Sequence, residues 1–300
     1  MPPLKLLYRD VDRTPYLYAL KFAAERHGLQ IDVERPEGRE YGDLLARGEA
    51  DVLAENYYGL QTFAAKGAPF VSVTTSVTWP NELLLVPPGI TSMDDLAGKR
   101  FALRGVGSSE LISRLWLADT GLDLTMEPVV FKEAEVGRWG QWNKVVSGDC
   151  HACLVTNMYA DPALAAGLTP LPIEPFGYMG NVTLTTSRDV IAARRTDIEL
   201  LVRAAFDAHT LLKTDRATAL DIMGGEPRRL MKIESDAVVE RLYEIIRDEL
   251  SDRPVPSVEG LRNMRRMALP ASPELADFNP LLMWDLSFAH DVIAATAPSV

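Results

Sequence analysis

The feature that most constrains this chain is a repeated alternation of short strand-like and helix-like segments over its first two thirds. Leu4–Tyr8 is an apolar run typical of a buried strand, and residues 14–27 follow as a helix with Pro15 in its first turn and Thr14 as the expected N-cap. The other strands are expected at residues 30–34, 51–54, 70–75, 101–104, 127–132, 151–155 and 168–173, with helices between them. This order is typical of an α/β fold in which helices cover both faces of a parallel sheet.

Two extended segments interrupt this alternation. The first, residues 79–86, leads into Pro87-Pro88-Gly89, and the second covers residues 179–186. After the second segment the chain is expected to be helical to its end, with breaks at Gly224-Gly225 and at residues 254–256. We therefore expect two βα lobes joined by two extended crossings, with a helical C-terminal tail. Lobe 1 is expected to contain residues 1–82 and 183–300, and lobe 2 to contain residues 83–182 as an insertion.

The charge balance of the chain limits the classes of binding partner that we expect. The chain carries 31 Lys and Arg residues against 42 Asp and Glu residues, and its net charge of −11 repels nucleic acid and acidic membranes at long range. The spacing of Arg262, Arg265 and Arg266 is that of a solvated helix face. No apolar run approaches the roughly 20 residues that a membrane span requires. We expect neither nucleic-acid binding nor membrane insertion.

The only two cysteines, Cys150 and Cys153, are not expected to form a metal site. A structural zinc site needs a second pair of ligands, and this sequence offers none at a suitable spacing. The pair falls in or next to an expected strand, where buried thiols are the simplest interpretation. Neither a metal nor a redox cofactor is expected.

The N-terminal sequence bears on localisation. The chain enters its first strand almost directly after Met1, without a basic region, an apolar core or a small-residue cleavage site. This pattern predicts a cytoplasmic protein. The alternative is a periplasmic or extracellular protein from which a signal peptide has been removed.

One stretch of the sequence carries a family resemblance. Residues 90–103, Ile-Thr-Ser-Met-Asp-Asp-Leu-Ala-Gly-Lys-Arg-Phe-Ala-Leu, followed by Gly105-Val106-Gly107-Ser108-Ser109, resemble the central signature of the type II periplasmic-binding-protein fold. The nearest relatives within that fold are the SsuA/THI5-like group, whose two junctions of helix, glycine, acidic residue and strand are similar to residues 47–52 and 147–152. The resemblance spans roughly residues 4–215 and implies a small-molecule-binding protein or one of the cytosolic enzymes with the same fold.

The candidate site residues follow the strands, because open parallel sheets bind ligands outside the carboxyl ends of their strands. Arg9 and Arg104 are expected to grip a carboxylate through paired hydrogen bonds, although each could instead be a surface arginine. The loop from Gly105 to Ser109 is expected to offer backbone N–H groups and a helix N-terminus, capped by Ser108 or Ser109, to an anion. The expected ligand-binding residues are Arg9, Asp10, Asn56, Tyr57, Trp79, Asn81, Glu82, Arg104, Gly107, Ser108, Ser109, Asn157 and Tyr178.

Aromatic and acidic side chains complete the expected site. Tyr57, Trp79 and Tyr178 could form apolar walls around a ligand, or could simply pack between the lobes. Glu55 is the best-placed general acid or base, because apolar surroundings raise the pKa of a carboxylate toward neutrality. The alternative roles for Glu55 are binding a ligand amine and capping the following helix.

Two functions are compatible with these observations. The predicted cytoplasmic location favours an enzyme without cofactors, a lyase that decarboxylates or dehydrates a small carboxylic acid bound between the two lobes. Residues 10–14, Asp-Val-Asp-Arg-Thr, are similar to a stretch near the start of dihydroxyphthalate decarboxylase. The alternative is a substrate-binding protein of an ABC importer, without catalysis and with a membrane permease as its partner.

Overall fold

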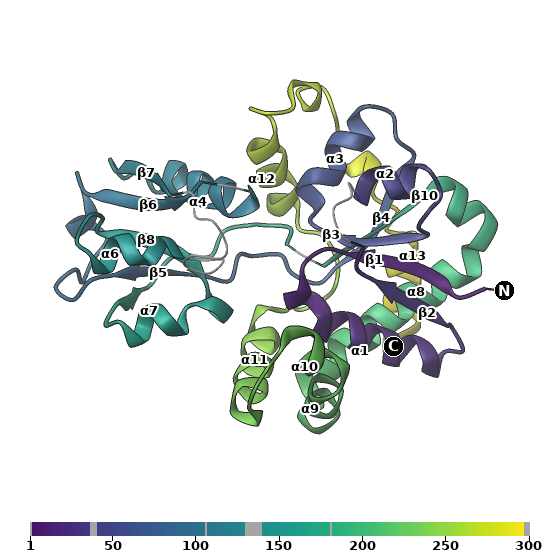
Figure 1. The fold of residues 1–300 in the computed structure, drawn as a ribbon. Helices are drawn as coiled ribbons and strands as arrows, with labels where there is room; N and C mark the ends of the chain where they lie inside the picture. Colours follow the sequence, from purple (N-terminus) through teal and green to yellow (C-terminus); the bar gives the residue numbers. More distant parts are fainter. Residues whose placement is uncertain (1, 37–40, 106, 130–139, 181, 297–300) are drawn as a thin grey trace. The chain divides into compact units, whose positions relative to one another are not determined.

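The computed structural model describes residues 2–36, 41–105, 107–129, 140–180 and 182–296, which form two compact units (Figure 1). Unit 1 is Met1–Trp79 with Gly177–Val300, and unit 2 is Pro80–Phe176. The boundaries differ from the expected ones by a few residues at each crossing. Residues 80–82 belong to unit 2 because Glu82 already pairs with Thr156 in its sheet. Tyr178 belongs to unit 1 because its backbone N–H donates to the Thr78 carbonyl.

Unit 1 is built on a five-stranded sheet with the order β2-β1-β3-β10-β4. β1 pairs in parallel with β2 and β3, whereas β10, the strand that returns from unit 2, is antiparallel to β3 and β4. Every residue of β4 and β10 is buried, as expected for a sheet covered on both faces. The strands are β1 Leu4–Tyr8, β2 Ile31–Glu34, β3 Val52–Glu55, β4 Phe70–Thr75 and β10 Thr183–Ser187.

Helices cover both faces of this sheet. α1 (Thr14–Arg26) and α8 (Arg188–Thr214) pack together on one face, while α2 (Tyr41–Ala46) and α3 (Tyr57–Ala65) lie on the other (Figure 1). The expected cap of α1 is wrong. The helix begins at Thr14 itself after the 3-10 turn Val11–Arg13, and the Thr14 hydroxyl donates to the Val11 carbonyl.

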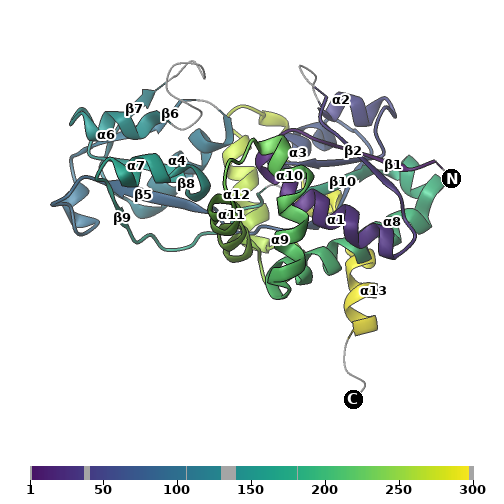
Figure 2. The same cartoon turned by 60° about the horizontal axis from the view of Figure 1, so that its bottom comes forward.

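The helical tail predicted after residue 186 belongs to unit 1. Figures 1 and 2 both show α9, α10 and α11 gathered near α1, while α12 packs on α3. The predicted breaks are confirmed, since α9 ends at Gly224 and residues 250–257 separate α11 from α12. The helices are α9 Arg216–Gly224, α10 Glu226–Met231, α11 Asp236–Glu249, α12 Val258–Ala268 and α13 Ser287–Thr296, with 3-10 turns η5 Pro273–Leu275 and η6 Pro280–Met283.

Unit 2 repeats the same topology on a second five-stranded sheet, with the order β7-β6-β8-β5-β9. β6 pairs in parallel with β7 and β8, and β5, the strand that enters from unit 1, is antiparallel to β8 and β9. The strands are β5 Glu82–Val86, β6 Arg100–Arg104, β7 Thr125–Val129, β8 Ala152–Thr156 and β9 Thr169–Leu171.

The alternation of side chains along these strands builds a core on each face of the unit 2 sheet. On one face, Leu84 and Leu154 pack with Trp116 of α4 (Gly107–Thr120). On the other face, Leu85 and Val155 belong to a cluster that includes residues of α6 (Asn143–Val146) and α7 (Asp161–Ala165). The described part of unit 2 also contains the 3-10 turns η2 Asp94–Leu96, η3 Gly140–Trp142 and η4 Asn157–Tyr159. The α/β class of the fold is confirmed. Parts of the expected strand 127–132 and of the following helix lie outside the described residues.

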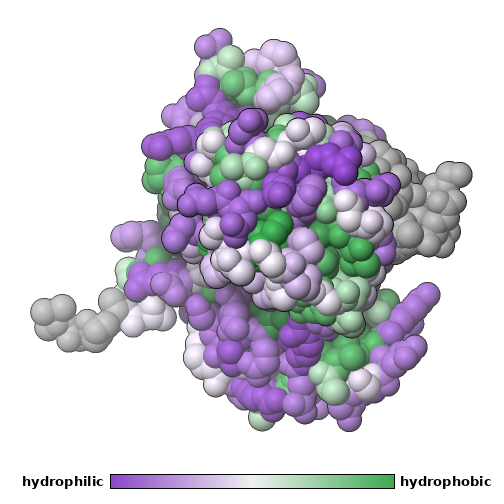
Figure 3. Space-filling view, turned by 90° about the vertical axis from the view of Figure 1, so that its left-hand side faces the viewer, coloured by the Kyte–Doolittle hydropathy of each residue, from purple (hydrophilic) through white to green (hydrophobic). Residues whose placement is uncertain are grey.

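The prediction that the two cysteines are buried thiols is confirmed. Cys150 and Cys153 are free thiols, 2% and 0% exposed, and both join the core cluster on the α6 and α7 side of the sheet. Burial raises the pKa of the Cys153 thiol. In Figure 3 hydrophilic residues cover most of the surface in view, with hydrophobic ones in small groups. Across the described ranges, none of the helices combines the length and apolarity needed to cross a bilayer.

Candidate functional site

The two sheets carry matching residues at their carboxyl edges. Arg9 directly follows β1 and Arg104 ends β6, and these two strands hold the same position in the strand orders of their sheets. Asn56 follows β3 and Asn157 follows β8, the strands that pair in parallel with β1 and β6. The residues expected to bind ligand therefore occur as topologically equivalent pairs, one member in each unit. Each unit presents one guanidinium and one amide at the edge where α/β sheets bind ligands.

In unit 1, Arg9 lies against Glu55 and Tyr41. Its Nε atom is 3.4 Å from Glu55 Oε1, and its guanidinium carbon is 4.8 Å from the centre of the Tyr41 ring. The Arg9 side chain is 47% exposed, whereas that of Glu55 is 13% exposed. Burial raises the pKa of Tyr41, and the nearby Arg9 opposes that shift. This arrangement orients a half-exposed guanidinium that can still donate to an anion.

Asn56 joins the same edge to the crossing segment. Its side-chain oxygen caps α3 by accepting from the Tyr58 amide at 3.4 Å, and its Nδ2 donates to Tyr178 Oη at 2.9 Å. Tyr178 is 6% exposed. The structure thus brings together two predicted site residues that are 122 positions apart.

Helix α12, in the helical tail, contacts the segment that carries Tyr178. The Gly177 amide donates to Glu259 Oε1 at 2.9 Å, and Asn263 Nδ2 donates to the Gly177 carbonyl at 2.8 Å. A Cβ atom at Gly260 would lie 3.0 Å from the Tyr178 carbonyl oxygen, so a glycine permits this close approach. Sequence reasoning missed these positioning residues, because nothing local relates α12 to the crossing.

One predicted site residue is corrected. Tyr57 is 0% exposed, its hydroxyl donates to the Pro280 carbonyl at 3.0 Å, and its ring packs against Trp284 with centres 5.6 Å apart. Burial raises the pKa of its phenol. Tyr57 is therefore a core residue rather than a ligand wall. Trp79, the last residue of the first segment of unit 1, is partly exposed, and its contact with a ligand stays a prediction.

A buried ion pair lies just beyond Asp10 in the sequence. Asp10 precedes the turn Val11–Arg13, and the Arg13 amide donates to its carbonyl at 3.0 Å. Arg13 Nη1 is 2.6 Å from Glu249 Oε1, with the two side chains 18% and 5% exposed. Burial alone would lower the pKa of Arg13, but Glu249 and Asp12 more than offset this and raise it. The last turn of α11 is thereby fixed to the start of α1, another link that local sequence patterns do not reveal.

In unit 2, Arg104 and Ser109 are in direct contact. Arg104 Nη1 donates to the Ser109 hydroxyl at 3.1 Å. The expected capping role of Ser109 is wrong, because α4 begins at Gly107 and Ser109 lies in its first turn. The Gly105 amide donates to the Val129 carbonyl at 3.1 Å, so this N–H extends the sheet instead of facing a ligand. Gly107 and Ser108 lie at the start of α4, and their proposed ligand contacts stay predictions.

The remaining candidates of unit 2 lie where β5 and β8 meet. The Thr156 hydroxyl donates to Glu82 Oε1 at 3.2 Å, and the Asn157 amide donates to the Asn81 carbonyl at 2.9 Å. Asn81, Glu82 and Asn157 are all partly exposed, so they remain accessible at this edge. Among the described residues, no group of three or more His, Cys, Asp or Glu side chains could hold a metal ion.

Comparisons with known proteins agree with this topology. One solved structure similar to the chain is the periplasmic sulfonate-binding protein SsuA of a putative sulfonate ABC transporter from Methylobacillus flagellatus. The two sequences are 16% identical, the TM-score is 0.71, and the alignment covers 98% of this chain and 94% of that one. The alkanesulfonate-binding protein SsuA from Xanthomonas axonopodis pv. citri bound to MOPS is also similar (21% identity, TM-score 0.60, 95% and 98%). The fold is that of the periplasmic binding proteins.

The family comparison points in the same direction. Residues 23–156 match the family model described as NMT1/THI5 like, which confirms the resemblance to the SsuA/THI5-like group. The fold also occurs in an enzyme, since the desulfurization enzyme DSZB is similar over 98% of this chain and 100% of its own, at 13% identity and a TM-score of 0.66. No curated protein matches the chain. The solute-binding fold is therefore established, and the ligand and the activity are questions for the site residues.

Proposed function

We propose that this protein is a solute-binding protein that captures a small organic anion for an ABC importer. The observation that carries the proposal is the equivalent pair of arginines, Arg9 after β1 and Arg104 at the end of β6. A guanidinium donates several parallel N–H groups, which suits the oxygens of a carboxylate or a sulfonate. The proposal assigns anion binding to both units.

The neighbouring side chains support recognition of a whole molecule rather than an inorganic ion. Asn56 and Asn157 can donate or accept, and the partly exposed Trp79 offers aromatic surface for the body of a ligand. The similar SsuA proteins bind sulfonates, according to their descriptions. We therefore extend the ligand class expected from the sequence, a small carboxylic acid, to carboxylates and sulfonates together.

The lyase expected from the sequence is the second candidate. It is favoured by Glu55, a mostly buried carboxylate at a strand end beside Arg9, and by the occurrence of an enzyme with the same fold. In that mechanism Arg9 and Arg104 would hold the substrate carboxylate, and Glu55 would move the proton. The comparisons favour the binding-protein alternative, since most of the similar structures described above are transport proteins.

A ligand screen with matched anionic and neutral compounds tests the proposal. We expect carboxylates or sulfonates to raise the melting temperature and their amides or alcohols to have no effect, because a ligand that binds only the native state stabilises it. Arg9→Gln and Arg104→Gln should each weaken the binding of the best anion about tenfold or more. Arg203→Gln, which removes an exposed arginine of α8, is the matched control and should leave affinity unchanged.

The same samples separate the two functions. After prolonged incubation a solute-binding protein returns its ligand intact, whereas a lyase releases carbon dioxide or water and loses this activity in Glu55→Gln. Unchanged affinity in both arginine variants would contradict the proposed anion site. Turnover abolished by Glu55→Gln would replace the transport function with the enzymatic one.

A further inference from the structure

The exposed face of α12 has a composition unlike the rest of this acidic chain. Its buried face carries Leu261 and Met264, which pack into unit 1. The opposite face carries Arg262 and Arg266, both exposed, and begins at Val258, which is 71% exposed. Within a protein of net charge −11, this helix presents arginines next to an apolar side chain.

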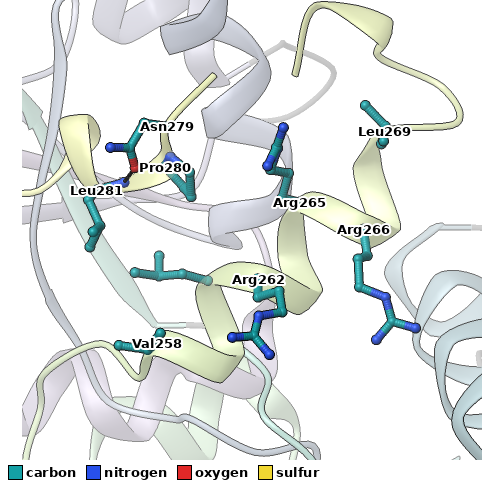
Figure 4. A pocket seen from close by; sticks show the side chains of 9 residues that line it. Val258, Arg262, Arg265, Arg266, Leu269, Asn279, Pro280 and Leu281 are labelled. Atoms are coloured by element: carbon teal, nitrogen blue, oxygen red, sulfur yellow. Dashed lines mark hydrogen bonds between the residues drawn. The ribbon is translucent and has the colours of Figure 1, made fainter. Parts of the chain in front are cut away.

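A second apolar segment runs beside this helix. In η6, Leu281 and Leu282 are 51% and 66% exposed. Figure 4 shows Val258 of α12 and Leu281 of η6 lining an open groove, with the Arg262 guanidinium beside Val258. The groove has a volume of about 330 Å³ and is walled by α12 on one side and by residues 279–281 on the other. We call it the α12 groove.

The three arginines of the α12 groove are not equivalent. Arg265 is occupied, since its Nε donates to the Leu275 carbonyl at 2.7 Å, and Arg266 Nη1 donates to Asn263 Oδ1 at 3.1 Å. Arg262 is exposed, and no carboxylate among the described residues pairs with it. The groove therefore combines one available guanidinium and two partly engaged ones with the exposed apolar side chains of Val258 and Leu281.

We propose that the α12 groove is a docking surface for an acidic amphipathic segment of a partner protein. Charge complementarity selects an acidic occupant, and the exposed Val258, Leu281 and Leu282 select one that also carries apolar anchors. Such exposed apolar groups rimmed by arginines are typical of protein interaction sites. The eleven residues of α12 extend for about 16 Å, which matches about three turns of a partner helix. The inference is independent of the solute site, because it uses other residues.

Binding of synthetic peptides tests this docking surface. The probe is a labelled peptide of about twelve residues, with leucines at helical spacing on one face and glutamates on the other. We expect it to bind the full chain with a Kd below about 1 mM, and more weakly as the salt concentration rises. A peptide with glutamine in place of each glutamate should bind at least tenfold more weakly.

Variants of exposed residues localise the binding without disturbing the fold. Arg262→Glu should weaken peptide binding at least tenfold, and Leu281→Ser should weaken it severalfold. Arg203→Glu makes the same change of charge at an exposed position of α8 and should have no effect. All variants should keep the wild-type melting temperature.

Three results would overturn the proposal. The first is the absence of binding by the acidic peptide up to about 1 mM. The second is an equal loss of binding in Arg262→Glu and Arg203→Glu, which would indicate long-range charge effects instead of a groove. The third is Arg262-dependent binding to vesicles of phosphatidylglycerol that is as strong as binding to the peptide, which would identify a membrane surface as the occupant.

Discussion

The two units share a strand order but differ in what covers their sheets. In unit 1 the sheet lies under the 27-residue α8 and the 13-residue α1, and every residue of β4 and β10 is buried. In unit 2 the longest described helix, α4, has 14 residues, α6 and α7 have 4 and 5, and the edge strands β7 and β9 are largely exposed. The same topology is therefore compatible with covering helices of different lengths. We expect the chain to unfold in two steps, so that each perturbation can be assigned to one unit.

The units also bury different chemical groups. Unit 1 buries charged and titratable side chains, among them Glu249 and His209 at 4% and 3% exposure. Unit 2 buries the two thiols. Changes in charge or pH should therefore act mainly on the stability of unit 1.

The largest effect is expected from the buried ion pair of unit 1. Glu249→Gln removes the nearest charge partner of the buried Arg13 and leaves the more distant Asp12 and Asp10. Removing one member of a buried pair typically costs 3–5 kcal/mol, and because Asp12 remains we expect about 3 kcal/mol in the unfolding of unit 1. Urea titration followed by circular dichroism measures this loss.

Glu240→Gln is the matched control for this prediction. Glu240 pairs with Arg216 at 3.0 Å on the surface, with side chains 56% and 51% exposed. Exposed pairs contribute at most about 1 kcal/mol, so this variant should unfold nearly as the wild type does. Equal losses in the two variants would show that burial does not distinguish the two pairs.

A smaller effect is expected from the protonation of His209. Burial lowers the pKa of His209 to about 4, the Ser251 carbonyl opposes this shift, and Lys213 adds to it. His209 Nε2 lies 2.5 Å from the Ser251 carbonyl oxygen, and its Nδ1 has no hydrogen-bond partner in the described structure. The neutral ring therefore suits the folded state, and a second ring proton would be buried without an acceptor.

The direction of the pH dependence follows from these pKa values. The unfolded chain takes up the proton near pH 6.5, whereas the folded chain takes it up only near pH 4, so stability falls as the pH falls through this range. Between pH 7 and pH 5 the loss from this group is about 2 kcal/mol for unit 1. His209→Gln should remove that part of the slope, whereas His290→Gln, at an 80% exposed side chain, should not. An unchanged slope in His209→Gln would contradict this assignment.

The sequence predicted what depends on local patterns. Apolar runs such as Phe70–Thr75 indicate strands, and helix breakers such as Gly224-Gly225 indicate helix ends, whatever the tertiary contacts are. Most helices and strands and the two-lobed architecture were therefore predictable. The Arg13–Glu249 pair joins residues 236 positions apart, and no local signal relates them. Tyr57 follows a strand as a ligand-binding residue would, but Trp284 and Pro280 bury it from the far end of the chain. Contacts made by the helical tail were the part that local patterns could not show.

Asn56 after β3 and Asn157 after β8 allow the carboxyl edges of the two sheets to be compared directly. Asn56→Ala removes the cap of α3 and the bond to Tyr178, and should destabilise unit 1 by about 1 kcal/mol. Asn157→Ala should cost less than about 0.5 kcal/mol, because in the described structure only the backbone of Asn157 makes a hydrogen bond. Chemical denaturation measures both losses. If Asn157→Ala were the more destabilising variant, the side chain of Asn157 would have a structural role that its contacts do not indicate.

The smallest effect is expected for the thiols of native unit 2. Cys150 and Cys153 are almost fully buried, and burial raises the pKa of both thiols, so the reactive thiolate is scarce in the folded state. A thiol reagent such as dithionitrobenzoate should label the native protein negligibly at pH 8 over a period in which the urea-unfolded protein reacts completely. Labelling at low urea concentrations then reports the opening of unit 2 alone.

This reporter tests whether the two units differ in stability independently. Each unit has its own core, so Glu249→Gln, which destabilises unit 1, should leave the labelling rate of unit 2 unchanged. Leu84→Ala, which removes a fully buried side chain from β5, should accelerate labelling at intermediate urea and serves as the positive control. If Glu249→Gln accelerated labelling as much as Leu84→Ala does, the stability of unit 2 would depend on that of unit 1. The contrast between the two sheets would then describe one cooperative system rather than two.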